Sequence, residues 1–512
     1  MNLLFIVADQ WRGDTLGALG TPGVSTPHLD ALAGNGTTFT RHFSQASPCG
    51  PSRASMLTGL YMMNHRQVGN WTPMSPGLTN IAELLHDAGY DCGLIGYTDT
   101  PVANDGAHAK PEDAPERWIC PGFRVVEPFL FSQGFANWRA HLTARGYDVP
   151  AGNTRIFLAP PDTGREGGRN FPASYYAAQD SDTAFLTDAA VRFIAEAGVR
   201  PWFLHFNCLR PHPPIVAPSP YHDLIDPDDV QMPRRPAPIE TIADSHPLHD
   251  AYLQTQRLKE YFGEEIASGA VSETLERRMR ATYYGNCAEV DANIGRLVNA
   301  LKEAGVYEDT LIVFTSDHGD QLGDNWIYGR RGVFDGHFHV PLVFHNPRRI
   351  PANATRRAFT EHVDLAPTFL ELLGLDVDQH FDGVSLLPLI HDQTASLRDA
   401  AHFELDFRDY PGREMPRILG LEDHRCNASV LRTDEFKYVH CAGLAPMLFD
   451  YRDDPAETRN VASDPRYAGV VAEYAQRMLD WRLSHQREGF TFHHQVYGER
   501  LIDSRQKNDP GR

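Results

Sequence analysis

A string centred on one cysteine offers the clearest chemistry in this sequence. Residues 47–59 read SPCGPSRASMLTG, so Cys49 is followed by Pro51, Ser52 and Arg53. Proline suits the first turn of a helix, where free N–H groups and the helix dipole favour an anion or a negatively charged nucleophile. The spacing therefore predicts a helix start beside Cys49 that can hold an anion. Taken alone, the pattern also fits an inert buried cysteine.

Other reactive side chains follow apolar runs at four places along the chain. These groups are Asp9-Gln10, Tyr97-Thr98-Asp99, the stretch from Asn207 to His212, and Ser316-Asp317-His318. In parallel sheets, ligands bind beyond the carboxyl ends of the strands. If the runs are such strands, the four groups meet at one sheet edge; otherwise they are caps and turns.

Strand and helix patterns alternate along most of the chain. Continuous apolar runs at residues 3–8, 92–97, 202–206, 310–314 and 340–344 predict buried strands. Helical spacing indicates helices at 81–88, 183–197 and 290–305. Strands separated by helices predict an α/β fold with a mostly parallel central sheet sandwiched by helices.

The pattern changes after residue 389. Short strand-like pieces at 401–407, 429–431, 436–440 and 447–450 precede a helix at 467–483 and predict a small antiparallel-sheet α+β subdomain. We therefore expect a catalytic domain over residues 1–389 and a smaller C-terminal subdomain with a tail over 390–512. Residues 104–170, rich in Pro, Gly and charge, are expected to form an insertion over the site. The tail beyond residue 489 either reaches a neighbouring subunit or frays.

Charge and cysteine content restrict the class of protein. The 512 residues hold 47 Lys+Arg against 67 Asp+Glu, a net charge of −20, which argues against nucleic acid as a partner. The opening apolar run lacks a basic leader and a cleavage site, and no apolar stretch approaches the roughly 18 residues of a membrane span. The seven cysteines are scattered without C-x-x-C spacing, as in a reducing compartment. We expect a cytoplasmic protein with no membrane partner.

The full cysteine string, C-x-P-S-R followed by A-S-x-L-T-G, resembles the signature of the type I sulfatases of the alkaline phosphatase superfamily. The resemblance extends over nearly the whole chain, through residues 3–10, 315–320, 364–368, 382–388 and 448–458. Within the family the chain most resembles the cytoplasmic phosphonate monoester hydrolases and their related arylsulfatases. The strings that carry this are residues 9–12 (DQWR), 64–66 (NHR), 210–214 (RPHPP), 317–324 (DHGDQLGD) and 403–409 (FELDFRD).

The resemblance implies a modified residue and a metal. Cys49 would be oxidised to formylglycine by a maturation system, and one hydroxyl of the hydrated aldehyde would attack sulfur or phosphorus while the other expels the product. One divalent cation would be held by Asp9, Gln10, Asp317 and His318 together with residue 49. The histidine in an otherwise oxygen-rich set favours manganese, with calcium, magnesium or zinc as alternatives.

Further roles follow from the resemblance. Arg53 would hold the modified side chain, and His212 would contact the transferred group or protonate the leaving oxygen. Relatives place a substrate-binding Lys where Arg330 stands, and Arg331 is a rival for that role. Asn70 would offer its amide to the substrate.

Tyr97 and Asp99 mark a departure from the pattern of typical sulfatases. Typical sulfatases place a Lys and a His in this stretch, whereas the phosphonate hydrolases have Tyr first and hydroxyl residues after it. Tyr97 agrees with the latter and Asp99 with neither. A carboxylate here disfavours doubly charged phosphate monoesters and leaves sulfate monoesters, phosphonate monoesters and phosphodiesters, each with one charge. Asp99 could instead face a cationic part of the substrate or cap a helix.

The sequence thus favours a metal- and formylglycine-dependent hydrolase of monoanionic esters, foremost an arylsulfatase with promiscuous phosphonate monoester and phosphodiester hydrolysis. One alternative reverses these activities. Another is an unmatured, non-catalytic binding protein, and a third is direct catalysis by the Cys49 thiolate. Relatives suggest a homodimer or homotetramer.

Overall fold

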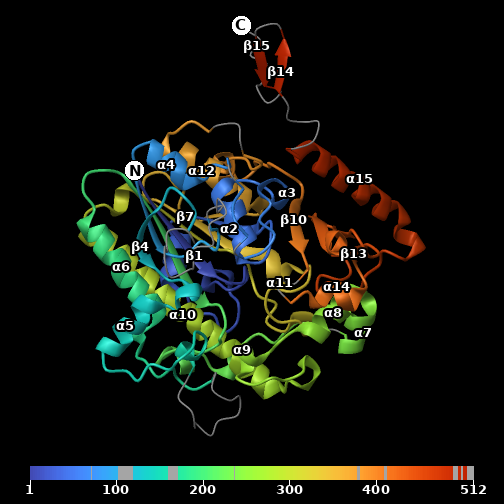
Figure 1. Ribbon diagram of the computed structural model, residues 1–512, viewed down its shortest axis with the longest axis horizontal. Coiled ribbons are helices and arrows are strands. Elements are labelled where there is room, and N and C mark those ends of the chain that lie inside the picture. The colour runs from blue at the N-terminus through green and yellow to red at the C-terminus, as the bar shows by residue number, and fades with distance from the viewer. Residues whose placement is uncertain are drawn as a thin grey trace.

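A nine-stranded sheet forms the centre of the computed structural model (Figure 1). The structure describes residues 1–70, 72–75, 77–101, 119–158, 171–235, 237–377, 381–408, 412–487, 494–497 and 500–503. The strand order is β4-β3-β5-β1-β6-β7-β2-β8, with β9 paired to β2. The strands are β1 (Asn2–Asp9), β2 (Thr37–Phe43), β3 (Asp91–Gly96), β4 (Arg124–Pro128), β5 (Trp202–Pro211), β6 (Thr310–Ser316), β7 (His339–His345), β8 (Ala354–Arg356) and β9 (Thr360–Glu361). Strand β7 is antiparallel to both its neighbours, and the other pairs are parallel.

Strand β1 shows why the central strands have continuous apolar sequences. Its residues Leu4 and Ile6 pack into one core and Leu3 and Phe5 into another, because successive side chains point to opposite faces. The first core includes side chains of α1 (Pro27–Gly34), α5 (Ala136–Ala144), α6 (Asp182–Glu196) and α10 (Glu273–Glu303). The second includes side chains of α2 (Cys49–Thr58), α4 (Ile81–Asp87), α12 (Leu365–Leu373) and α13 (Leu387–His391). Both faces of the sheet are therefore covered by helices.

A second, four-stranded antiparallel sheet lies beyond the first in the sequence. It runs β10 (Ala401–Asp406), β11 (Asn427–Arg432), β12 (Phe436–Cys441) and β13 (Met447–Asp450). Leu431, Tyr438 and Leu448 pack against Trp481 of α15 (Ala468–His485), and the opposite face packs toward the large sheet through Phe403. The two sheets confirm the predicted fold class.

The remaining elements are short. They are α3 (Met62–His65), α7 (Ile239–Ser245), α8 (Pro247–Thr255), α9 (Lys259–Phe262), α11 (Asp335–Phe338), α14 (Glu414–Leu419) and the antiparallel pair β14 (His494–Tyr497) and β15 (Arg500–Asp503). Among the described residues, every helix is too short or too polar to cross a membrane.

Two expectations about organisation meet the structure only in part. Of the predicted insertion, residues 104–118 and 159–170 lie outside the described residues, while its middle supplies β4, an edge strand of the large sheet, and α5. The predicted domain boundary at 389/390 falls inside α13, whose Leu389 and Ile390 are buried in the core of the large sheet. The second sheet begins at Ala401, so the division at residue 389 stays a prediction.

Candidate active site

Strand register brings the predicted site residues to one edge of the large sheet. Strand β1 lies between β5 and β6, with Asp9 opposite Pro211 and Ala8 opposite Ser316. Asp9, His212 and Asp317 therefore follow neighbouring strands at the same end, as parallel alignment requires. Strand β3 pairs with the other side of β5 and leads directly into Tyr97.

Helix α2 brings Cys49 to that edge. It begins at Cys49 itself, so Pro51 is its third residue rather than its first. Ser52 donates a hydrogen bond to the carbonyl oxygen of Asp317, and the Gly50 amide donates to Asn70 Oδ1 at 2.8 Å. The helix start is thus fixed to the end of β6 and to the side-chain oxygen of Asn70.

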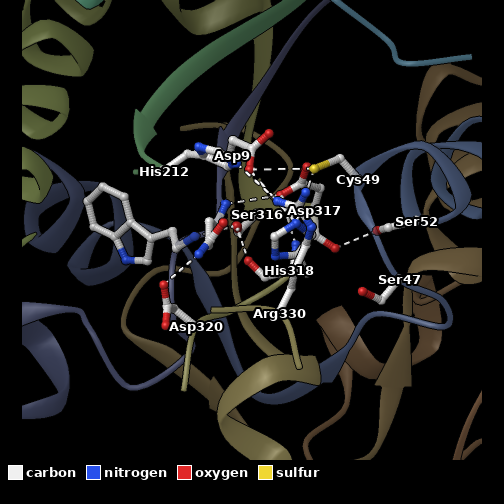
Figure 2. A network of polar contacts seen from close by, with 12 residues as sticks. Asp9, Ser47, Cys49, Ser52, His212, Ser316, Asp317, His318, Asp320 and Arg330 are labelled. Atoms are coloured by element: carbon white, nitrogen blue, oxygen red, sulfur yellow. Dashed lines mark hydrogen bonds and ion pairs between the residues drawn. The ribbon is translucent and has the colours of Figure 1, made fainter. Parts of the chain in front are cut away.

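Four buried side chains meet at this point and form what we term the ligand cluster: Asp9, Cys49, Asp317 and His318 (Figure 2). Their potential ligand atoms lie within 4.8 Å of one another. His318 Nδ1 lies 2.9 Å from the Gly319 carbonyl oxygen, which fixes the tautomer and points Nε2 into the cluster, 3.2 Å from Cys49 Sγ and 3.8 Å from Asp9 Oδ1. Such an orienting hydrogen bond on the far nitrogen is typical of metal-binding histidines.

Arg53 compensates the negative charge of the cluster. Its Nη2 lies 2.9 Å from Asp317 Oδ2 and 3.3 Å from Asp9 Oδ2, and its Nη1 donates to Asn207 Oδ1 at 2.6 Å. Burial alone would raise the pKa of Asp9, but nearby His212, Arg53 and His318 outweigh burial and hold this pKa well below its usual range. Asp9 is therefore ionised at any working pH, as a metal ligand must be.

Gln10 extends the donor set. Its Nε2 donates to Tyr261 Oη at 2.9 Å and to Asp320 Oδ2 at 2.5 Å. Its Oε1 is buried without a hydrogen-bond partner among the described residues. An unsatisfied buried carbonyl costs about 1–3 kcal/mol, and a cation would remove that cost. The carboxylates, the His318 Nε2 nitrogen and this oxygen together fit one divalent cation.

The thiol of Cys49 is in an unfavourable place for a lone thiolate. Burial, followed by the charge of Asp9, raises its pKa well above the usual value. A thiolate is disfavoured there unless a cation lies beside it, which sets a requirement on the alternative of direct thiolate catalysis.

The structure separates the two rival arginines. Arg330 Nη1 lies 3.0 Å from His212 Nε2, beside the ligand cluster (Figure 2). Arg331 instead donates to Thr255 Oγ1 at 3.4 Å. His212 Nδ1 is 2.6 Å from the Pro213 carbonyl oxygen, so Nε2 accepts from Arg330. Burial and then Arg330 lower the pKa of His212 against the opposing charge of Asp9, so its imidazole is neutral near pH 7.

Tyr97 and Asp99 differ in their surroundings. Tyr97 donates to Asp9 Oδ2 at 2.6 Å, and the Arg53 guanidinium stacks over its ring at 4.4 Å, so Tyr97 supports the ligand cluster directly. Asp99 has a left-handed backbone (φ 51°) and its carbonyl oxygen abuts Gly50. Burial raises the pKa of Asp99 to about 7, with Asp9 adding to that rise and Arg53 opposing it.

Several residues of the site carried little signal in the sequence. Tyr261 lies on the four-residue helix α9, where periodicity says nothing. Asn207 and Asp320 stood inside the polar strings that mark the strand ends, but their types alone do not tell a supporting residue from a ligand. A signal for them was the crowding of polar residues directly after apolar runs.

Comparisons with known proteins agree with this geometry. The family model described as Sulfatase matches residues 1–375, and the one described as N-sulphoglucosamine sulphohydrolase, C-terminal matches residues 323–484. The multifunctional alkaline phosphatase superfamily protein PehA of Trinickia caryophylli is 38% identical over 494 residues, covering 94% of this chain and 95% of that protein. An arylsulfatase of Clostridium perfringens is 26% identical, covering 96% of each.

Solved structures give the same picture. The phosphonate monoester hydrolase of Agrobacterium radiobacter superimposes with a TM-score of 0.90 at 38% identity, covering 98% of this chain and 99% of that one. The phosphonate monoester hydrolase of Silicibacter pomeroyi gives 0.88 at 34% identity, covering 99% and 100%. The chain belongs to the sulfatase family of the alkaline phosphatase superfamily and is a hydrolase of that family.

Proposed function

We propose that this protein hydrolyses singly charged esters with a divalent cation and a formylglycine derived from Cys49. The observation that carries the proposal is the ligand cluster, in which the potential ligand atoms of two buried carboxylates, the His318 imidazole and residue 49 lie within 4.8 Å of one another. The cation would be held by Asp9, Gln10, Asp317 and His318, and manganese suits this mixed oxygen and nitrogen set better than calcium or magnesium.

Phosphonate monoesters are our first candidate substrates. The sequence favoured sulfate esters, but the relatives at 38% and 34% identity that carry a named substrate are phosphonate monoester hydrolases. Sulfate esters are the second candidate, supported by the family model and by the arylsulfatase at 26% identity. Phosphodiesters carry the same single charge and are a third activity of the same site.

The residues of the chain divide the work between binding and proton transfer. When present, the hydrated aldehyde supplies the nucleophilic oxygen and the cation lowers the pKa of that oxygen. Arg53 neutralises part of the carboxylate charge and keeps both ligands in place. Arg330 binds the oxyanion of the ester, and His212 contacts the transferred group through Nε2, which must take up a proton before it can pass one to the leaving oxygen.

Asp99 restricts the charge of the substrate. Its carboxylate interacts electrostatically with Arg53, Arg330 and the carboxylates of the ligand cluster. In its ionised form, Asp99 repels the two charges of a dianionic phosphate monoester more strongly than the single charge of a monoanionic ester. Asp99 therefore favours phosphonate monoesters, sulfate monoesters and phosphodiesters over phosphate monoesters.

The test compares kcat/KM for an aryl phosphonate and an aryl sulfate with one preparation, beside the mass of the peptide containing Cys49. We expect the mass of an aldehyde at residue 49 and a preference for the phosphonate. A large sulfate preference would reverse the order of substrates. An unmodified thiol without turnover, from a host that has the maturation system, would favour the non-catalytic binding protein. Cys49→Ala should lose activity. Cys441→Ala, at a buried cysteine of β12, is its matched control and should retain activity.

A further inference from the structure

The two ends of the Gln10 amide lie in opposite chemical environments. The nitrogen faces two oxygen atoms, Tyr261 Oη at 2.9 Å and Asp320 Oδ2 at 2.5 Å. The oxygen has no partner among the described residues, although Gln10 is 1% exposed. The backbone amide of Gln10 donates to Asp317 Oδ1 at 3.1 Å, which places the residue against the ligand cluster.

Asp320 is held so that it can only accept from Gln10. Its Oδ1 accepts the backbone amides of Leu322 at 2.7 Å and Gly329 at 2.8 Å. Its Oδ2 accepts from Gln10 and from the Tyr261 hydroxyl at 2.7 Å. A carboxylate that receives four donors in fixed positions has no freedom to turn away, and as an acceptor it repels the amide oxygen.

The same pair decides which way the amide of Gln10 faces. A reversed amide would put Oε1 against Asp320 Oδ2 and present N–H groups, which cannot bind a cation, on the other side. In the observed orientation Nε2 donates two hydrogen bonds, and Oε1 has no partner among the described residues. It also places a carboxylate behind the amide, which polarises Oε1 toward negative charge and strengthens it as a ligand.

We propose that Tyr261 and Asp320 are positioning residues that fix the Gln10 amide with Oε1 toward the cation. The inference rests on the metal site of the proposed function. It adds that Gln10, the neutral ligand, depends on the carboxylate of Asp320. Asp320 therefore acts on the cation through Gln10 and not by direct contact.

A double-mutant cycle on Mn²⁺ affinity tests this inference. Tyr261→Phe removes one hydroxyl, and we expect Mn²⁺ to bind about 10-fold to 100-fold more weakly, as is usual when an outer-shell partner is lost. In a Gln10→Leu background the same change should have no further effect, because the amide through which Tyr261 acts is gone. Tyr307→Phe, which removes a hydroxyl bonded to His345, is the matched control and should leave Mn²⁺ affinity unchanged.

A charge exchange supplies a second, independent arm. Asp320→Asn should weaken Mn²⁺ binding, because an asparagine amide can donate to Gln10 Oε1 and reverse the amide. Adding Gln10→Glu should restore it, since the glutamate can accept from the asparagine with one oxygen and bind Mn²⁺ with the other. The electron paramagnetic resonance spectrum of bound Mn²⁺ should change in the single variant and return in the double variant.

The outcomes separate this inference from the proposed function. If Tyr261→Phe and Gln10→Leu each weakened Mn²⁺ binding and their effects multiplied in the double variant, the positioning role would be overturned while the metal site stands. The same holds if Gln10→Glu failed to restore Mn²⁺ binding in Asp320→Asn. A wild-type protein that binds no Mn²⁺ would overturn both.

Discussion

The pairing of Arg53 with two buried carboxylates predicts a stability change that depends on the cation. The side chains of Arg53, Asp9 and Asp317 are 1%, 2% and 0% exposed, and Arg53 lies 3.3 Å and 2.9 Å from the two carboxylates. Arg53→Met keeps most of the volume and removes the charge. Loss of one partner from a buried ion pair costs about 3–5 kcal/mol, because the remaining charges stay buried without compensation.

The expected shift in Tm follows from the length of the chain. An unfolding entropy of roughly 2.1 cal/mol/K per residue over 512 residues is about 1.1 kcal/mol/K, so the variant should lose about 3–5 °C in a chelating buffer. With saturating Mn²⁺ the cation takes over the compensation of both carboxylates, and the loss should fall to about half. Thermal unfolding followed by circular dichroism in the two buffers measures both values.

A matched variant separates this effect from a general loss of buried charge. Arg280 is equally buried and lies 3.1 Å from Asp324, away from the ligand cluster. Arg280→Met should therefore lose the same Tm with and without Mn²⁺. If Arg53→Met also lost the same Tm in both buffers, or lost none, Arg53 would not be compensating the carboxylates that bind the cation.

Four further variants test the remaining assignments. Cys49→Ala should lower kcat about a thousandfold or more without lowering Tm, and near-wild-type turnover would exclude a nucleophile at this position. Arg330→Gln should weaken kcat/KM and raise the pKa of His212, moving its limb of the pH profile to higher pH, because burial and the charge of Arg330 hold this pKa down. Arg331→Gln should do neither, and equal effects of the two variants would contradict their separation. Asp99→Asn should raise kcat/KM for a phosphate monoester relative to a phosphonate monoester about tenfold, and an unchanged ratio would remove Asp99 from substrate selection.

The sequence predicted those elements whose environment is uniform along their length. Strands β1, β5 and β6 are buried on both faces, so their apolar runs are continuous and easily recognised. Strand β2 reads TTFTRHF and was not predicted, because its polar side chains are satisfied by contacts from distant parts of the chain. The direction of β7 likewise depends on its partners, since an apolar run has the same composition in either direction.

The site followed the same rule. Residues that stand directly after apolar runs, such as Asp9, Asp317 and His212, could be assigned to one sheet edge. The choice between Arg330 and Arg331 could not be made, because it depends on which of two adjacent side chains turns toward His212. Asn70 has a structural contact that its sequence position did not indicate, because its side-chain oxygen accepts the Gly50 amide, and its role toward the substrate stays a prediction.

Because Cys49 is buried in the folded chain, its thiol is accessible to a modifying enzyme only for a limited time during synthesis. Cys49 is 3% exposed in the folded chain, and two of the side chains around it, Asp317 and His318, come from the end of β6. His318 follows Cys49 by 269 residues (318 − 49), and at about 5–20 residues per second the ribosome needs roughly 13–54 s to produce them. Throughout that interval the pocket around the thiol lacks Asp317 and His318. If Cys49 is modified as we propose, the modifying enzyme would have tens of seconds on the nascent chain, and slower synthesis between residues 49 and 318 should increase the modified fraction.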